Sequence, residues 1–384
     1  MSKKRNILVF QLHHLFGIHP IHHTVIQSFL EDGCSVDLVY ADYPDSESNL
    51  SQYDIYKIGL RFYHGKNIFL YFFSFISASY KIWKLIFSRN YEVVVVIEPQ
   101  ALMVMLPFLI CMRAFDLSTK VVYVSLEIIF MSELKRWTWR QYKKIESWSS
   151  RQVDIVVSQD SWRKELLSKE NNIPEKYILC IPNCEHGASK YSKSFYLHDH
   201  LGINRDKRIL LCLGTPSFMS VFLTDLLDDS QAWDEDWVLV IHSGVNGALN
   251  VPELLNGRVY FTTTSLPAKD VGLLYQSADV GLAIYIGYDG PTGGKNLDCV
   301  GYSSGKFNMF LKYGKPVITT NQYTFKNIFH QSKCGISIES FAEIPYAMRA
   351  IESNYSEFSC QASWFYNSEL NVKPYIEKFL KEIE

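Results

Sequence analysis

The sequence lacks an excess of charge of one sign, a CxxC motif and a long unbroken apolar run. Its 38 Lys and Arg residues nearly balance 40 Asp and Glu residues, which gives a formal net charge of -2. The chain as a whole therefore has no strong positive field that would favour nucleic acid. The 8 cysteines are scattered without the spacing of metal ligands, a pattern typical of reduced thiols in the cytoplasm. Charged residues or prolines interrupt every long apolar stretch, so we predict neither a membrane span nor a secretory signal.

The 384 residues do contain enough apolar sequence for more than one core. Hydrophobic residues make up 47% and charged residues 20% of the chain, which is close to the average of globular proteins. The length corresponds to about two to three domains. The aromatic share of 15% is high, and its excess gathers in two segments described below.

Short β-branched runs alternate with segments of helical length along the whole chain, and one of these segments, at 101–114, predicts a single helix. The first half predicts strands at 7–10, 36–40, 93–97, 121–124, 155–157 and 177–181. These runs do not alternate with polar residues, which is typical of parallel strands buried on both faces. After a polar stretch at 190–208, the pattern restarts with strands at 209–213, 237–241, 259–262, 280–284, 316–319 and 335–338. Two doubly wound α/β units follow from this order.

We therefore predict a chain of two Rossmann-like domains. The first covers residues 1–188, a linker covers 189–204, the second covers 205–364, and a helix covers 365–384. In open parallel sheets, ligands bind beyond the carboxyl ends of the strands. The residues that directly follow each predicted strand are therefore the candidates for a functional site.

A glycine-rich segment after the strand at 280–284 is the most informative part of the sequence. The loop ends at Ser304 and Gly305, where a helix begins, and Gly314 ends that helix just before the next strand. Glycines allow backbone N–H groups to approach an anion, and the first N–H groups of a helix favour phosphate. Lys306 adds a positive charge at the same place. The segment predicts a phosphate site; the alternative is a flexible surface loop before an ordinary helix.

The segment from Ser303 to Ile318 resembles the donor-binding helix and following strand of GT-B glycosyltransferases, particularly the family 4-like group 1 enzymes. Other segments resemble landmarks of that family in the same order, and they lie at 154–158, 181–183, 201–203, 209–214, 278–280 and 362–384. One departure stands out. Many family members place two glutamates eight positions apart near the donor, and here those positions hold Gly301 and Met309. The retaining mechanism of the family is therefore not carried over.

The resemblance implies two Rossmann-like domains that face each other across a cleft, with a C-terminal helix that crosses back to the first domain. It implies that the first domain binds the acceptor and the second binds a nucleotide sugar, which is a substrate, with no metal or cofactor. The implied reaction is glycosyl transfer to a hydroxyl of a glycan or lipid-linked acceptor, in the assembly of a bacterial surface polysaccharide or glycolipid. Two alternatives stay open: a nucleotide-sugar epimerase of the same fold, and a catalytically silent partner subunit.

Candidate donor-binding residues follow the predicted strands of the second domain. For the diphosphate they are Lys306, the backbone of Ser304, Gly305 and Phe307, and the turn at Gly214 and Thr215. For the nucleoside they are His242, Gly244 and Leu266, the last of which lies where the resemblance places the base. Asp289 is a candidate for a sugar hydroxyl or simply shapes an Asp-Gly turn.

Glycosyl transfer also requires a group that accepts the proton of the acceptor hydroxyl. Glu98 directly follows the strand at 93–97, and Glu127 follows the strand at 121–124. A carboxylate shielded from water has a raised pKa and accepts a proton near neutral pH. Alternatively, Glu98 caps a helix and Glu127 is an ordinary loop carboxylate. His13 and His14 are further candidates, and they begin a group of five histidines in which acceptor or phosphate contacts are favoured over a metal site.

Two aromatic segments predict contact with a membrane surface. The segment at 68–75 is followed by Lys81 and Lys84, and the segment at 134–144 interleaves basic and aromatic residues. Such mixtures suit helices that lie in the interface of anionic lipid. The alternative is a core helix with a solvated basic face. We expect a cytoplasmic protein that contacts the inner face of the membrane peripherally.

Overall fold

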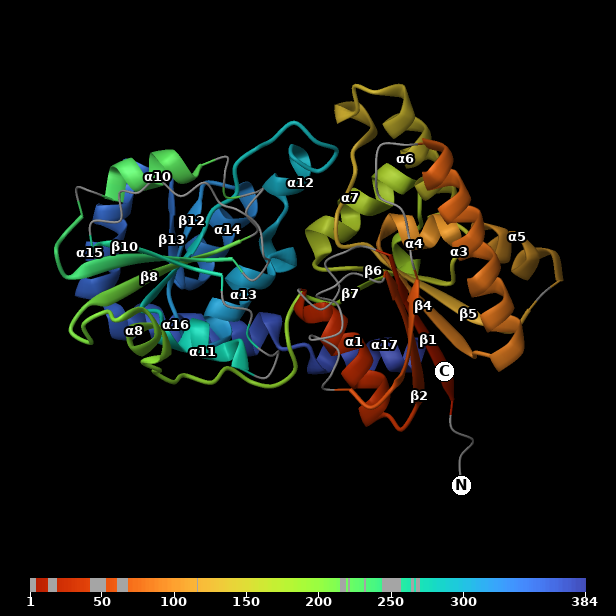
Figure 1. Cartoon of the computed structure of the whole chain (residues 1–384), viewed down its shortest axis with the longest axis horizontal. Helices are drawn as coiled ribbons and strands as arrows, with labels where there is room; N and C mark the ends of the chain where they lie inside the picture. Colours follow the sequence, from red (N-terminus) through yellow and green to blue (C-terminus); the bar gives the residue numbers. More distant parts are fainter. Residues whose placement is uncertain are drawn as a thin grey trace. The chain divides into compact units, whose positions relative to one another are not determined.

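The chain forms two parallel sheets, each within its own unit (Figure 1). In the computed structural model, the described residues are 5–12, 19–41, 53–60, 68–115, 117–214, 219, 222–230, 233–243, 257–263, 266 and 270–384. The first unit comprises Met1–His186 and Val372–Glu384, and the second comprises Gly187–Asn371. The predicted α/β class with two doubly wound domains is confirmed.

The first unit contains a seven-stranded sheet in the order β3-β2-β1-β4-β5-β6-β7. All its strand pairs are parallel. Buried apolar side chains dominate the central strands, because helices cover both faces of the sheet. The strands are β1 Asn6–Gln11, β2 Ser35–Ala41, β3 Tyr56–Leu60, β4 Val93–Ile97, β5 Lys120–Val124, β6 Ile155–Ser158 and β7 Ile178–Cys180.

The helices of the first unit include one from the C-terminal end of the chain. They are α1 Pro20–Glu31, α3 Ile68–Arg89, α4 Glu98–Val104, α5 Leu106–Phe115, α6 Trp137–Ser150, α7 Ser161–Asn171 and α17 Lys373–Glu382. The ring of Phe379 in α17 packs on Phe29 of α1 with 5.8 Å between centroids. The Nζ of Lys120 donates to the carbonyl of Glu382 at 3.3 Å. The C-terminal helix thus returns to the first unit, as the resemblance implied.

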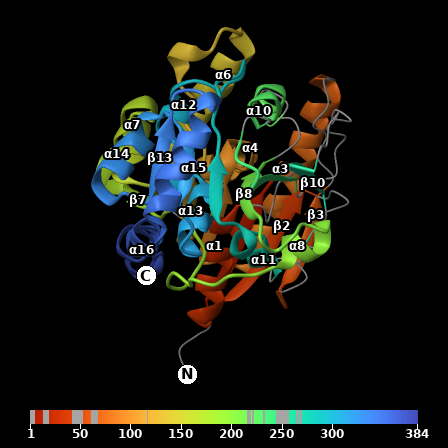
Figure 2. The same ribbon diagram turned by 90° about the vertical axis from the view of Figure 1, so that its left-hand side faces the viewer.

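The second unit contains a six-stranded parallel sheet in the order β10-β9-β8-β11-β12-β13 (Figure 2). Its strands are β8 Arg208–Leu213, β9 Trp237–His242, β10 Val259–Thr262, β11 Val280–Ala283, β12 Val317–Thr320 and β13 Gly335–Ile338. Its helices are α8 Tyr196–Leu201, α10 Leu223–Ser230, α11 Gly272–Ser277, α12 Lys295–Asp298, α13 Gly305–Lys312, α14 Tyr323–Ser332, α15 Ile344–Ser353 and α16 Tyr355–Phe365.

Helix α13 lies close against strand β11, and this contact sets where the helix begins. A Cβ added at Gly281 of β11 would come within 2.4 Å of the ring of Phe310 in α13. Only a residue without a side chain permits this approach. Gly314 adopts a φ of 66° and ends the helix, as predicted from the sequence. The start of α13 is thereby held at the carboxyl end of β11.

Two elements of the first unit differ from the sequence prediction. Strand β3 was not predicted, because this edge strand is partly exposed and lacks a β-branched run. The single helix predicted at 101–114 is instead two helices, α4 and α5, which meet at Met105. Pro107 lies in the first turn of α5, where it lacks the N–H that a continuous helix would need.

No single helix in the described ranges has the length and apolarity to cross a bilayer. Helices α4 and α5 pass that test only together, as a pair bent by 53°.

Candidate functional site

The start of helix α13 carries a polar cluster at the carboxyl end of β11. The Oγ of Ser304 accepts a hydrogen bond from the N–H of Phe307 at 3.1 Å and thereby caps the helix. The same hydroxyl is hydrogen-bonded to the hydroxyl of Tyr285, which follows β11. The predicted helix start at Ser304 and Gly305 is therefore present, and Tyr285 is a member of the cluster that sequence reasoning missed.

Lys306 points back to the end of β11. Its Nζ donates to the carbonyl of Ile284 at 3.0 Å and lies 4.3 Å from the centroid of the Tyr285 ring. Burial lowers the pKa of Lys306 to about 8. The lysine therefore changes its charge just above neutral pH, and the carbonyl and the ring hold its ammonium group beside the helix start.

Three other strands of the second unit end near this edge with predicted residues. His242 is the last residue of β9, and its carbonyl accepts from the N–H of Gly214, which follows β8, at 3.2 Å. Burial lowers the pKa of His242 to about 4, so its imidazole is neutral at physiological pH. Its Nδ1 has no hydrogen-bond partner among the described residues. Leu266 is partly buried beyond β10.

Of the remaining predicted donor residues, the structure describes Asp289 and Phe307 but not Thr215 and Gly244. Asp289 is exposed in the loop after β11. The ring of Phe307 packs in the core, 4.9 Å from that of Phe325, so its side chain points away from a ligand at the helix start. Thr215 and Gly244 lie outside the described residues.

The first unit carries a pair of candidate proton acceptors at the ends of β4 and β5. Glu98 directly follows β4 and has a φ of 74°, which is uncommon for a residue with a side chain. Burial raises the pKa of Glu98 well above its ordinary value, the charges of Glu127 and Glu146 raise it further, and Arg163 opposes them. Strained backbone at a strand end is typical of functional positions. The charge of Glu127 therefore acts on Glu98.

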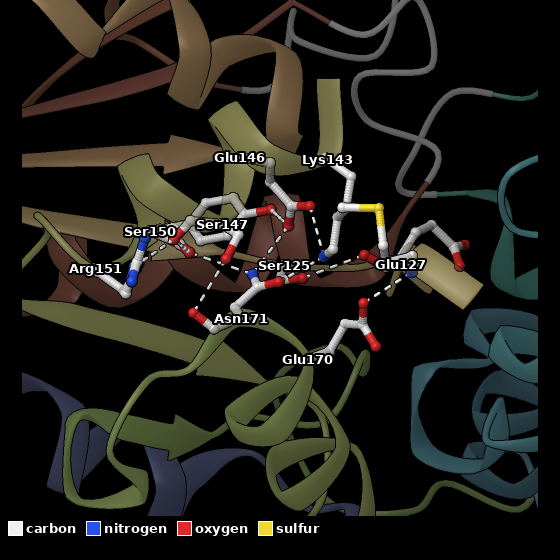
Figure 3. Close-up of polar contacts among 11 residues, drawn as sticks. Ser125, Glu127, Lys143, Glu146, Ser147, Ser150, Arg151, Glu170 and Asn171 are labelled. Carbon is white, nitrogen blue, oxygen red and sulfur yellow. Dashed lines mark hydrogen bonds and ion pairs between the residues drawn. The ribbon is translucent and has the colours of Figure 1, made fainter. Parts of the chain in front are cut away.

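The backbone that carries Glu127 is held by buried polar side chains from the turn after β6 and from the first turn of α7. The Nε2 of Gln159 donates to the carbonyl of Ser125 at 2.8 Å, and Arg163 donates to the carbonyl of Leu126 at 2.6 Å. The hydroxyl of Ser125 donates to the carbonyl of Glu127 at 3.2 Å (Figure 3). Both Gln159 and Arg163 are fully buried. Their role was not predicted, because nothing in the local sequence distinguishes them from a solvated helix start.

A buried ion pair within α6 is hydrogen-bonded to the end of α7. The Nζ of Lys143 is 2.8 Å from a carboxylate oxygen of Glu146 and also donates to Asn171 (Figure 3). The hydroxyl of Tyr123 and the amide of Asn171 both donate to Glu146 at 3.2 Å. These hydrogen bonds satisfy charges that would otherwise be costly to bury.

The predicted histidines are only partly placed. His13 and His14 lie outside the described residues. His22 is fully buried, and the Nδ1 of His23 is 2.9 Å from the hydroxyl of Tyr53. Within the described ranges, no group of three or more His, Cys, Asp or Glu residues is placed to hold a metal ion.

Comparison with known proteins identifies the fold. No protein-family model matches the chain, and a search of curated proteins finds no match. HepE of Anabaena in complex with UDP-glucose matches with a TM-score of 0.69 at 13% identity, over 98% of this chain and 99% of that chain. WaaG, a glycosyltransferase involved in lipopolysaccharide biosynthesis, matches with a TM-score of 0.62 at 14% identity, over 98% and 99%.

A protein of Listeria monocytogenes whose name assigns it only provisionally as a UDP-N-acetylglucosamine 2-epimerase also matches. Its TM-score is 0.60 at 12% identity, over 99% of this chain and 95% of that chain. At such identities the likeness establishes the fold, so this chain has the GT-B fold of two Rossmann-like domains. Transferases and an epimerase share that fold, and function must be argued from the residues.

Proposed function

We propose that this chain is a glycosyltransferase that moves a sugar from a nucleotide-sugar donor to a hydroxyl acceptor. The observation that carries the proposal is the start of α13, where Lys306 lies beside a capped helix end at the carboxyl edge of β11. The N-terminal end of a helix favours phosphate, and a lysine adds a full charge. The second unit is therefore assigned to the donor.

The donor diphosphate is assigned to Lys306 and the backbone of Ser304, Gly305 and Phe307. The N–H of Phe307 already donates to the Ser304 hydroxyl, so it contributes through the cap rather than directly. Gly214 and Thr215 are assigned to the same diphosphate, and His242, Gly244 and Leu266 to the nucleoside. Asp289 is assigned to a hydroxyl of the sugar. A neutral His242 suits this role because it offers a hydrogen-bond partner without a charge.

In the proposed reaction, the acceptor oxygen forms a bond to the anomeric carbon while the bond from that carbon to the diphosphate breaks. The diphosphate leaves with the electron pair, and Lys306 stabilises its growing charge. A carboxylate of the Glu98 and Glu127 pair takes the acceptor proton. Because the coupled pair holds on to a proton more strongly than one carboxylate alone, it accepts protons nearer to neutral pH. His13 and His14 are the alternative acceptors.

The acceptor is proposed to be a glycan or a lipid-linked sugar of a bacterial surface polysaccharide or glycolipid. The protein is proposed to be cytoplasmic and to contact the inner face of an anionic membrane. The involvement of WaaG in lipopolysaccharide biosynthesis agrees with this assignment. Exposed aromatic and basic residues of α3 and α6 support the membrane contact.

The experiment for the donor site is a binding screen of UDP, GDP, CMP, ADP and dTDP by thermal shift and calorimetry. One nucleotide should stabilise the protein, and Lys306→Ala should weaken its binding by about 1–3 kcal/mol, the usual contribution of a charge-assisted contact. Lys326→Ala, on the exposed face of α14, is the matched control and should bind normally. Equal affinity of the Lys306→Ala and control variants would refute the assignment of the helix start.

An epimerase is the second candidate, because the coupled carboxylates would also suit proton transfer to and from a sugar carbon. An epimerase changes the stereochemistry of its donor without an acceptor, whereas a transferase releases nucleotide only when the sugar moves. Analysis of the sugar after incubation with donor alone separates the two. A silent partner subunit would show neither reaction.

A further inference from the structure

Helix α3 exposes a continuous row of large apolar side chains. Phe69, Phe73, Ile76, Tyr80, Trp83 and Phe87 are spaced alternately four and three residues apart, which places them on one face of the helix. Each of them is between 42% and 74% exposed. At about 1.5 Å per residue, the row is roughly 27 Å long. The opposite face, with Ala78, Ile82 and Ile86, is buried and fixes the helix to the unit.

Helix α6 buries a pair of charged side chains and exposes large apolar side chains. Its buried residues are Lys143, Glu146, Ser149 and Ser150. Its exposed large side chains are Trp137, Trp139, Ile145 and Trp148, at 37% to 71% exposure. A helix on a solvated surface normally has the opposite arrangement. The hydrogen-bonded ion pair of Lys143 and Glu146 stabilises this orientation from within.

The two helices belong to one helical layer of the first unit. Helix α4 contacts α3, α5 and α6, and the ring of Phe87 in α3 packs on Phe108 in α5 at 5.9 Å (Figure 1). Glu146 is the single acidic residue in α3, α5 and α6, and it is fully buried. The exposed charges of these three helices are therefore all positive, and they include Lys81, Lys84, Arg113, Arg140 and Lys144.

We propose that α3 and the outward face of α6 dock the first unit on the headgroup region of an anionic bilayer. Aromatic rings enter the interface, while lysine and arginine side chains reach the lipid phosphates. The positive charges of these helices are complementary to the negative headgroups of an anionic bilayer, which favours this partner over others. Pairing with a second copy of the same helices would bring cations beside cations, because α3, α5 and α6 themselves carry no exposed acid to neutralise them.

The inference specifies the partner of the proposed function, but its test needs no donor sugar. The full chain is mixed with vesicles of phosphatidylcholine alone or with about 25% phosphatidylglycerol, and binding is measured by flotation at about 0.1 M salt. We expect at least about tenfold tighter binding to the anionic vesicles, weakened by added salt. Transfer activity measured separately on a soluble acceptor would survive a failure of this test.

Variants localise the contact. The double variant Phe73→Ser with Trp83→Ser should lower the affinity about tenfold or more, because two rings leave the interface. Lys81→Glu with Lys84→Glu should abolish the preference for anionic lipid. The control Tyr323→Ser with Tyr346→Ser removes two rings of the second unit that are 55% and 70% exposed, and this variant should bind like the wild type. All three pairs are exposed, and circular dichroism checks that they fold.

Three results would overturn the inference. The first is that the wild type fails to float with anionic vesicles. The second is that the α3 variants float as well as the wild type. In the third, sedimentation shows a dimer that the Phe73→Ser and Trp83→Ser variant dissociates, which would identify a second copy of the chain as the occupant.

Discussion

Single residues of the candidate site are tuned by burial more than by neighbouring charge. Burial lowers the pKa of Lys306 and of His242 and raises the pKa of Glu98. All three follow or contact the carboxyl end of a strand, where parallel sheets bind ligands. Perturbed groups at such an edge are typical of functional sites, and here Lys306 and His242 lie at the edge of one sheet and Glu98 at the edge of the other.

The pKa of Lys306 predicts how donor binding depends on pH. The lysine loses its charge near pH 8 in the unliganded protein, so the affinity for a nucleoside diphosphate should fall as the pH rises from about 7 to about 9. Lys306→Arg keeps its charge over this range, and its affinity should fall less. Calorimetry at the two pH values measures both. A wild type and an arginine variant with the same pH dependence would contradict this role.

Glu98 predicts a pH-dependent effect on stability. Its pKa is raised in the folded protein, so between the unfolded and folded pKa values the folded state holds the proton and the unfolded state has lost it. Glu98 therefore destabilises the fold increasingly as the pH rises through that window, by about 1.4 kcal/mol per unit of pKa difference. Glu98→Gln should be more stable than the wild type at about pH 8 and gain little at about pH 4.

Urea unfolding at both pH values measures this difference. Glu92→Gln, at the residue that precedes β4, makes the same substitution at the other end of the strand and is the matched control. A Glu98→Gln variant that is less stable than the wild type at high pH would show that its carboxylate is favourably paired.

At the scale of elements, the sequence predicted most strands because their β-branched runs are buried on both faces. It failed at β3, where the edge strand is partly exposed and carries a weaker pattern. It also placed one helix where Pro107 starts a second. The start of α13 could be predicted because a glycine-rich loop that ends in Ser304, Gly305 and Lys306 is typical of a helix start that favours phosphate. Tyr285 could not, because an aromatic residue after a strand looks like an ordinary core residue.

The carboxylate site was less predictable than the donor site. Glu98 and Glu127 follow strands and were found by position alone. Gln159 and Arg163 hold the backbone next to Glu127 by donating to its carbonyl groups. A sequence does not show which distant carbonyl group a side chain reaches. Lys143 and Glu146 are three residues apart and read as a solvated pair, yet both are buried.

A substitution at Gly281 should change the position of α13 against β11. A Cβ at this position would clash with the ring of Phe310, so Gly281→Ala should push α13 away from β11. Overpacking of this kind destabilises a core by about 1–3 kcal/mol, and the displaced Lys306 should bind the nucleotide more weakly. Thermal unfolding and nucleotide titration measure both effects. Unchanged stability would show that α13 moves freely over β11.

A substitution at Arg163 of α7 should disturb the position of Glu127, the candidate base. Arg163→Met removes the donor that holds the carbonyl of Leu126, so Glu127 should lose its position and turnover should fall by about tenfold or more. The pH profile of turnover should shift as well, because the guanidinium no longer opposes the raised pKa of Glu98. Nucleotide affinity in the second unit should stay unchanged. A variant that lost affinity and turnover equally would indicate general unfolding.

At the scale of the whole molecule, the two units carry separate parts of one proposed reaction. The second unit holds the cation and helix start assigned to the donor, and the first holds the coupled carboxylates and the aromatic face. The account therefore predicts that changes in the two units have different kinetic effects. Lys306→Ala should raise the donor concentration needed for turnover, whereas Glu98→Gln with Glu127→Gln should abolish turnover and leave nucleotide binding intact.

The most direct measurement is mass spectrometry of the products formed from a panel of nucleotide sugars, with and without a mixed glycan and glycolipid acceptor. The account predicts that one donor yields a nucleoside diphosphate and a sugar-extended acceptor in equal amounts, and that the double glutamine variant yields neither. An epimerised donor formed without acceptor, or equal product from the double variant, would contradict it.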